Sequence, residues 1–217
     1  MSEPLKITYY FDVLSQWCYF ADRALDDVRR EFGDRIDLSF KVKLINDGEP
    51  LAYSPAQLEA IYGRSKAVSG IETTAAWLRP GDSSLYANLV VEAVRGLGGD
   101  AERTRRRLSR AALEEGVRVG TFETALQAGA EHSGYDAETL AQRMREAEHR
   151  VRETTAEFHA LPVEVVPALI LRNAIGDTAI LSGLFERDTF ATVVREMLRA
   201  GDMYERYGNE HPELANF

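Results

Sequence analysis

The spacing of apolar residues changes repeatedly along this chain of 217 residues, and these changes limit the folds that it can adopt. Residues 7–13 are rich in β-branched and aromatic side chains, which predicts a short buried strand. From residue 17 to residue 32 the apolar positions fall at helical spacing, and Gly33 follows as the expected C-cap. Over residues 36–44 apolar and polar residues alternate, which predicts a second strand. The first fifty residues therefore predict a β-α-β unit.

The strand pattern is absent from the next hundred residues, where helical patterns replace it. We expect helices over residues 55–66, 84–97, 101–115, 122–132 and 137–159. The residues expected to cap their starts are Ser54, Asp100, Thr121 and Asp136. Residues 51–159 are thus predicted to form a separate helical block.

Strand patterns return after Pro162. Two apolar runs, residues 167–171 and 178–181, lie on either side of a turn signal and predict a hairpin. A last amphipathic helix is expected over residues 190–198. Residues 201–217 are polar without clear periodicity, so we expect a loosely held C-terminal tail.

This order of elements predicts an α/β fold, β-α-β followed by β-β-α, with a large all-α insertion. The two strand-bearing segments must form one sheet across the insertion. We therefore expect one domain from residues 1–50 and 160–200, a helical insertion domain from residues 51–159, and a tail from residues 201–217.

Composition and charge exclude several classes of function. The formal net charge of -9 disfavours nucleic-acid binding, which needs a basic face. Cys18 is the only cysteine, so no intrachain disulfide or multi-cysteine metal site can form. The four histidines lack metal-ligand spacing, and we expect no metal. Because no apolar run is long enough for a membrane span or a leader peptide, we expect no membrane association and a cytoplasmic location.

The chemistry of the chain is concentrated where the first strand runs into the first helix, at Ser15-Gln16-Trp17-Cys18. Unpaired N–H groups at a helix start favour a thiolate, and the first exposed position of such a turn is the reactive one. Ser15 holds that position, whereas Cys18 lies one turn later on the same face, where it is more covered. Because serine cannot form a disulfide, a two-cysteine exchange cycle is excluded. Its hydroxyl can still donate a hydrogen bond to a substrate thiolate.

Nearly the whole chain resembles the DsbA branch of the thioredoxin superfamily. The start F-D-V-L-S is similar to kappa-class glutathione transferases and 2-hydroxychromene-2-carboxylate isomerases, and Trp17-Cys18-Tyr19 is similar to FrnE-like DsbA oxidoreductases. The resemblance implies a thioredoxin-like fold. It also implies a cis-proline bond between Val166 and Pro167, facing the helix start, with the Val166 backbone offered to a cysteine-containing substrate.

One stretch departs from the glutathione-using relatives. Those proteins have Ser-Asp or Gln-Asp after the glycine that follows the last strand, whereas this chain has Leu184-Phe185 after Gly183. The contacts that hold the glutamyl end of glutathione in those relatives are therefore not carried over.

The leading hypothesis is a DsbA-like thiol/disulfide oxidoreductase-type protein with a degenerate S-x-x-C site. Ser15 and Cys18 are its predicted catalytic residues, with Cys18 a secondary thiol. The predicted substrate-binding residues are Gln16, Trp17, Val166 and Pro167. The expected substrate is a small-molecule or peptide thiol. We expect no tightly bound cofactor, although glutathione is a possible cosubstrate. A homodimer is left open.

Two further hypotheses are a glutathione-dependent isomerase or transferase and a non-catalytic binding module with this fold. Simpler structural roles also compete with the catalytic ones. Ser15 can be merely an N-cap. Burial of Cys18 is favoured over reactivity. A run of arginines on a predicted helix favours a solvated face, and the run comprises Arg103, Arg105, Arg106, Arg107 and Arg110.

Overall fold

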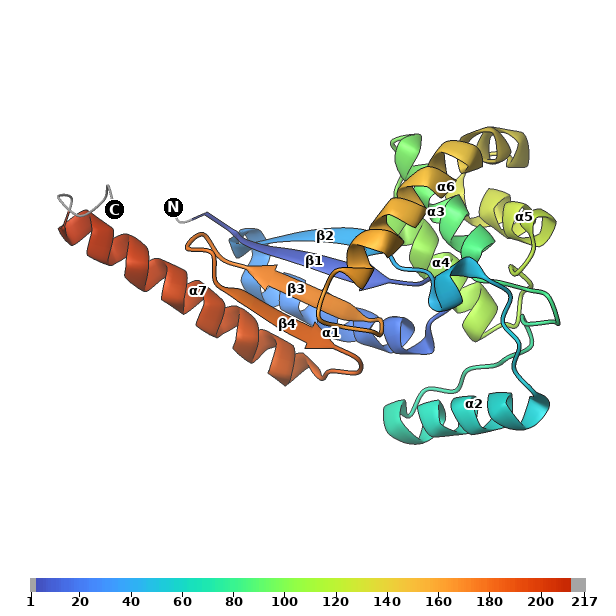
Figure 1. Cartoon of the computed structure of the whole chain (residues 1–217), viewed down its shortest axis with the longest axis horizontal. Helices are drawn as coiled ribbons and strands as arrows, with labels where there is room; N and C mark the ends of the chain where they lie inside the picture. Colours follow the sequence, from blue (N-terminus) through green and yellow to red (C-terminus); the bar gives the residue numbers. More distant parts are fainter. Residues whose placement is uncertain (1–2, 212–217) are drawn as a thin grey trace.

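The computed structural model describes residues 3–211 and contains a four-stranded sheet built from both ends of the chain (Figure 1). The strands are β1 (Leu5–Phe11), β2 (Ile36–Val42), β3 (Ala168–Arg172) and β4 (Thr178–Ser182), in the order β2-β1-β3-β4. β1 pairs parallel with β2 and antiparallel with β3, and β3 pairs antiparallel with β4. The predicted β-α-β unit and hairpin therefore form one sheet across the insertion, as expected.

Two helices pack beside this sheet. α1 (Gln16–Phe32) begins directly after Ser15 and ends at Gly33, whose φ of 50° lies in the region that favours glycine. α7 (Arg187–Glu210) packs against α1, β1 and β4. The helix continues through residues 201–210, so the expectation of a loosely held tail from residue 201 was wrong there. The core-facing apolar periodicity ends at Leu198 because the helix then runs past the sheet, as Figure 1 shows. Residues 212–217 of the expected tail lie outside the described residues.

The insertion consists of α2 (Pro55–Ser69), α3 (Leu85–Gly96), α4 (Ala101–Leu113), α5 (Phe122–Ser133) and α6 (Ala137–His159). Short 3-10 turns, Gly33–Arg35 and Ile45–Gly48, flank β2. The four predicted N-caps each accept a hydrogen bond from the helix that they precede. Among residues 3–211, no helix combines the length and apolar character needed to cross a membrane.

α3 is the centre of the insertion, whereas α2 lies apart from it. Most of α3 is buried, and it packs against α4, α5 and α6. In α2, by contrast, Ser65 is the only buried residue of the fifteen. Figure 1 shows α2 set off from the other helices and joined to them by extended connections.

The insertion covers the sheet at one end only. Lys6 and Thr8 on β1 are not buried, whereas Tyr10, Phe11 and the preceding Tyr9 are. The Tyr10 ring packs edge-on against Phe158 of α6, with ring centroids 5.2 Å apart. β1 is therefore buried on both faces where it runs into Ser15, and this burial makes the start of α1 part of the molecular core.

A buried ion pair joins the insertion to α1. Arg105 of α4 is 1 % exposed and donates two hydrogen bonds to the carboxylate of Asp22, at 3.1 and 2.7 Å. Its guanidinium lies 5.1 Å from the centre of the Phe11 ring, close enough for a cation–π contact. Arg105 therefore does not lie on the solvated face expected of the arginine run, whereas Arg103, Arg107 and Arg110 are exposed as expected.

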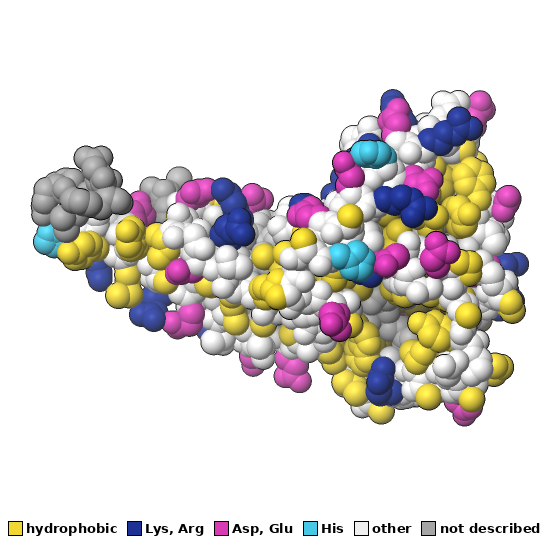
Figure 2. Space-filling model, viewed as in Figure 1, with side chains coloured by type: hydrophobic (Ala, Val, Ile, Leu, Met, Phe, Trp, Pro, Cys, Tyr) yellow, Lys and Arg dark blue, Asp and Glu magenta, His cyan; other side chains and the backbone are white. Residues whose placement is uncertain are grey.

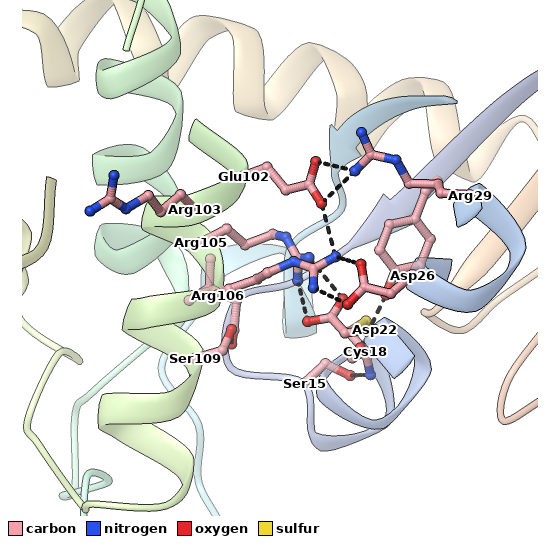
Figure 3. Close-up of polar contacts among 12 residues, drawn as sticks. Ser15, Cys18, Asp22, Asp26, Arg29, Glu102, Arg103, Arg105, Arg106 and Ser109 are labelled. Atoms are coloured by element: carbon pink, nitrogen blue, oxygen red, sulfur yellow. Dashed lines mark hydrogen bonds and ion pairs between the residues drawn. The ribbon is translucent and has the colours of Figure 1, made fainter. Parts of the chain in front are cut away.

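Neighbouring charges extend this contact toward solvent. Arg106 donates to both oxygens of Asp26, at 2.6 Å each, and to Glu102, which also accepts from Arg29. Figure 3 shows Arg105 and Arg106 reaching from α4 to the acidic residues of α1. The solvated-face prediction was wrong for Arg105 and Arg106 because α1 supplies carboxylates at matching positions, one helical turn apart.

We predict that Arg105→Ala destabilises the protein by about 3–5 kcal/mol, because the substitution leaves the Asp22 carboxylate buried without its partner. Replacing both members with apolar residues, as Arg105→Met with Asp22→Leu, should recover most of that loss. Urea unfolding curves with an unchanged slope measure both effects.

The matched control is Arg103→Ala on the same helix. Arg103 is exposed and points away from α1 in Figure 3, so its loss should cost about 0.5 kcal/mol or less. Equal losses for the two single variants would contradict the structural role of the buried pair.

Candidate functional site

Ser15 stands at the start of α1 in the conformation of an N-cap residue. Its backbone is extended, with φ -79° and ψ 116°, and its Oγ accepts a hydrogen bond from the Cys18 N–H at 3.3 Å. The Ser15 N–H donates to the Asp12 carbonyl at 3.1 Å, which closes the turn between strand and helix. Because the hydroxyl oxygen is the acceptor in the cap, the hydroxyl hydrogen remains available to a substrate atom. The capping role and a role in substrate binding are therefore compatible.

The first turn of α1 also offers backbone donors. Among residues 3–211, the Gln16 and Trp17 N–H groups have no hydrogen-bond acceptor. No acidic side chain occupies this first turn, so nothing on the helix itself neutralises the positive end of its dipole. Two N–H groups and one hydroxyl thus meet where a negatively charged sulfur atom would be stabilised.

Cys18 lies beneath this turn and not on its surface. Its side chain is 1 % exposed, and its carbonyl accepts a hydrogen bond from the Tyr9 hydroxyl at 3.2 Å. Burial raises the pKa of the Cys18 thiol to about 12, against which the nearby Ser15 hydroxyl has a smaller opposing effect. The thiol is therefore protonated at neutral pH and is a poor nucleophile.

Asp12 fixes the turn from below. Its carboxylate is completely buried and accepts hydrogen bonds from the Leu14 N–H at 2.8 Å and the Ile45 N–H at 2.9 Å. One side chain thus ties the segment after β1 to the segment after β2. Burial raises the pKa of this carboxyl group. Asp12 was not among the predicted site residues, although an acidic residue inside an apolar run indicates a buried polar role.

The insertion holds the same turn from above. The Val13 N–H donates to the Asn88 side chain of α3 at 3.2 Å, and the Ser109 hydroxyl of α4 donates to the Val13 carbonyl at 2.6 Å. Both backbone groups of Val13 are therefore occupied by residues distant in sequence. No local pattern marks Asn88 or Ser109, so the sequence alone did not point to them.

A cavity of about 230 Å³ opens beside Ser15, between the motif and α2. Its motif side consists of Leu14, Ser15, Gln16 and Trp17, and α2 with its connections supplies Tyr53, Tyr62, Arg64 and Trp77 among others. On the face shown in Figure 2, hydrophobic side chains gather over the region where Figure 1 places α2. Ser15 is 6 % exposed, so this cavity is its route to a ligand.

The predicted substrate-binding residues of the motif both line this cavity. The Gln16 side-chain oxygen accepts a hydrogen bond from Thr73 at 2.9 Å, which anchors the connection that follows α2. The Trp17 ring packs edge-on against Phe20, with centroids 5.8 Å apart. Gln16 therefore holds the α2 side of the cavity in place, and Trp17 forms part of its wall.

Val166 and Pro167 lie at the same end of the sheet as the motif but outside this cavity. Tyr10 of β1 pairs with Ala168 of β3, so Pro167 lies next to the end of β1 from which the motif leads. The Val166–Pro167 peptide bond is cis. The Pro167 carbonyl accepts from Gly183 at 2.8 Å, whereas the Val166 N–H and carbonyl have no hydrogen-bond partner among residues 3–211. The Val166 backbone thus retains the pairing capacity that the resemblance implies.

The stretch after β4 has an internal packing role. Phe185 is buried and packs against Phe190, with ring centroids 5.7 Å apart, whereas Leu184 is exposed. Arg187 forms ion pairs with Glu31 and Asp188. This stretch therefore offers no polar side chain comparable to the Ser-Asp pair of the glutathione-using relatives. Within residues 3–211, His, Cys, Asp and Glu side chains form no group of three that could hold a metal ion.

Comparison with known families identifies the domain. The model of the DSBA-like thioredoxin domain matches residues 6–195, which is most of the chain. No curated protein matches the sequence.

Solved structures show the same architecture over nearly full lengths. A putative protein disulfide isomerase from Nitrosomonas europaea has a TM-score of 0.68 at 16% identity, covering 91% of this chain and 97% of its own. A probable DsbA oxidoreductase from Streptomyces coelicolor has a TM-score of 0.68 at 16% identity, with 89% of each chain covered. The cytosolic disulfide reductase DsbM from Pseudomonas aeruginosa, solved with GSH, has a TM-score of 0.62 at 19% identity, covering 93% of this chain and 99% of its own. At these identities the similarity establishes a thioredoxin-like fold.

We predict that Cys18 in the folded protein does not react with a water-soluble disulfide reagent at neutral pH. Raising the pH toward 10 should not make Cys18 reactive, because burial raises the pKa of its thiol to about 12 and the thiol stays protonated. The folded state holds this proton more tightly than the unfolded chain does. The resulting stabilisation is complete below the ordinary thiol pKa and is lost as the pH rises toward 12. Colorimetric thiol titration measures the reaction.

Unfolding in urea is the internal control, since it should release one reactive thiol per chain. Stoichiometric labelling of the folded protein at neutral pH would instead show that Cys18 is accessible and ionised.

Proposed function

The chain belongs to the DSBA-like thioredoxin-domain family, and we propose that it handles a thiol or disulfide substrate at Ser15, without a redox-active sulfur atom of its own. Members of this family are thiol oxidoreductases. The observation that carries the proposal is the Ser15 N-cap, whose hydroxyl lies beside the free Gln16 and Trp17 N–H groups and opens onto a cavity. These donors favour the thiolate form of a substrate thiol.

The reaction that this site supports is exchange between two substrates. A bound thiolate attacks one sulfur of a disulfide, one S–S bond forms as another breaks, and the departing thiolate takes up a proton. The protein contributes donors and orientation, while all the sulfur atoms that change partners belong to the substrates. Ser15 binds the attacking sulfur, and Cys18 remains a core residue because its thiol is protonated and buried.

The unpaired Val166 backbone supports a peptide or peptide-like disulfide as the second substrate. An extended segment can pair with such an edge as an additional strand. The single cysteine and the similarity to the cytosolic disulfide reductase DsbM support a reducing, cytoplasmic setting for the reaction.

A glutathione-dependent isomerase or transferase is the second candidate. It is favoured by a serine at the first motif position, and one structural neighbour was solved with GSH. The apolar Leu184-Phe185 pair opposes it because no side chain there can hold the glutamyl end. Calorimetry with millimolar glutathione separates the candidates. Heat of binding that survives in Cys18→Ala but not in Ser15→Ala would favour this second candidate.

We predict that Ser15→Ala lowers the rate of thiol–disulfide exchange about ten- to a hundredfold, because a hydrogen bond to a charged sulfur is lost. Exchange between a small thiol and an oxidised peptide, followed by chromatography, measures this rate. Cys18→Ala should change this rate no more than about twofold, because the buried Cys18 thiol takes no part in the proposed exchange.

Ser15→Thr is the matched control because it keeps both the hydroxyl and the N-cap. It should retain most of the activity, and circular dichroism should show that all three variants are folded. Equal rates in the wild type and Ser15→Ala would refute the proposal, and no turnover with retained peptide binding would favour a non-catalytic binding module.

A further inference from the structure

The cavity beside Ser15 has apolar walls and a single charge. Leu14, Ile45, Leu51, Leu58, Ile61 and Leu78 form its aliphatic part, and Trp17, Tyr53, Tyr62 and Trp77 form its aromatic part. Of the described residues, 3–211, Arg64 is the only charged one that lines the cavity, and no carboxylate does. Such a surface favours a ligand with an apolar body and one negative charge.

Arg64 lacks an acidic partner of its own. Among residues 3–211, no carboxylate lies within ion-pair distance of its guanidinium, which instead lies 5.9 Å from the centre of the Trp17 ring. Two residues further along α2, Lys66 does form an ion pair, with Glu72 at 2.9 Å. Arg64 is exposed and projects from α2 toward the Trp17 ring, which forms part of the cavity wall. Its charge is therefore available to a ligand in the cavity.

The size of the cavity limits the ligand to about one ring. Pockets for drug-sized ligands typically measure about 300–1,000 Å³, whereas this one measures about 230 Å³. The hydrogen bond from Trp77 Nε1 to the Tyr62 hydroxyl, at 3.0 Å, fixes two of the aromatic walls against each other. Glutathione is a poor match, because its ammonium group would find no carboxylate here.

We infer that this cavity binds a small monoanion with an apolar, ring-sized body, whose negative group contacts Arg64 while its other end lies at Ser15. Resting on the proposed function, the substrate would be a small thiol that carries one carboxylate. α2 is then the element that selects the substrate, and Arg64 is its specificity-determining residue. The preference of the cavity for a negatively charged ligand does not depend on sulfur, so it can be measured with ligands that contain none.

The chain offers its own reporter for the test. It has two tryptophans, Trp17 and Trp77, and both line the cavity, so tryptophan fluorescence reports on its occupancy. The probes are cyclohexanecarboxylate and its neutral isostere cyclohexanecarboxamide, which contain no sulfur. In the wild type the carboxylate should bind about fivefold more tightly than the amide, as expected for an exposed ion pair. Added salt should narrow this difference.

Arg64→Gln should abolish the preference and leave the affinity for the amide unchanged. Lys66→Gln is the matched control, since it removes one positive charge from the same helix outside the cavity and should keep the preference. Glutathione should bind more weakly than cyclohexanecarboxylate.

The inference would be overturned by equal affinity for both probes in the wild type, by an unchanged preference in Arg64→Gln, or by an equal loss of preference in Lys66→Gln. An absence of any fluorescence change with either probe would overturn it as well. Failure of the proposed function is distinguishable, because Ser15→Ala would then leave exchange unaffected while the sulfur-free probes still discriminate at Arg64.

Discussion

The buried ion pair between Arg105 and Asp22 is the contact on which the relation between the two parts of the molecule depends. Two charges in a dry interior are stabilising only when each satisfies the other, so the pair tolerates very little displacement. This requirement fixes the distance and rotation of α4 relative to α1. Because Ser109 lies one turn after Arg105 and holds the Val13 carbonyl, the same constraint reaches the turn that presents Ser15.

Position along the helix, more than the presence of sulfur, determines the chemistry of this motif. Ser15 ends an extended segment and faces a cavity, whereas Cys18 lies a turn later against Tyr9 and is closed off from water. The donors that would stabilise a thiolate are retained, although the chain has no cysteine at the position where they act. In the proposed function, these donors bind the sulfur atom of another molecule.

The order of elements could be predicted from the sequence because most elements bury one regular face or begin at a capping residue. The alternation in β2, the helical spacing after Trp17 and the four capping residues are local signals, and all correspond to observed elements. Arg105 and Arg106 of α4 were misjudged because burial of a charge depends on a partner from another helix, which no local pattern encodes, whereas Arg103, Arg107 and Arg110 are exposed as predicted. The support of the turn by Asn88 and Ser109 was missed for the same reason. The extension of α7 was missed because its last turns have no sheet to face.

The peripheral position of α2 has a consequence for how proteins of this architecture diversify. Fourteen of its fifteen residues are not buried, so most substitutions there leave the core untouched. The opposite side of the cavity is the first turn of α1, which hydrogen bonds to Asp12 and Val13 hold at the end of β1. Substitutions on α2 can therefore change the residues that line the cavity while the first turn of α1 stays in place. The α-helix with the fewest buried residues is thus the one in which ligand preference can change with the least effect on the core.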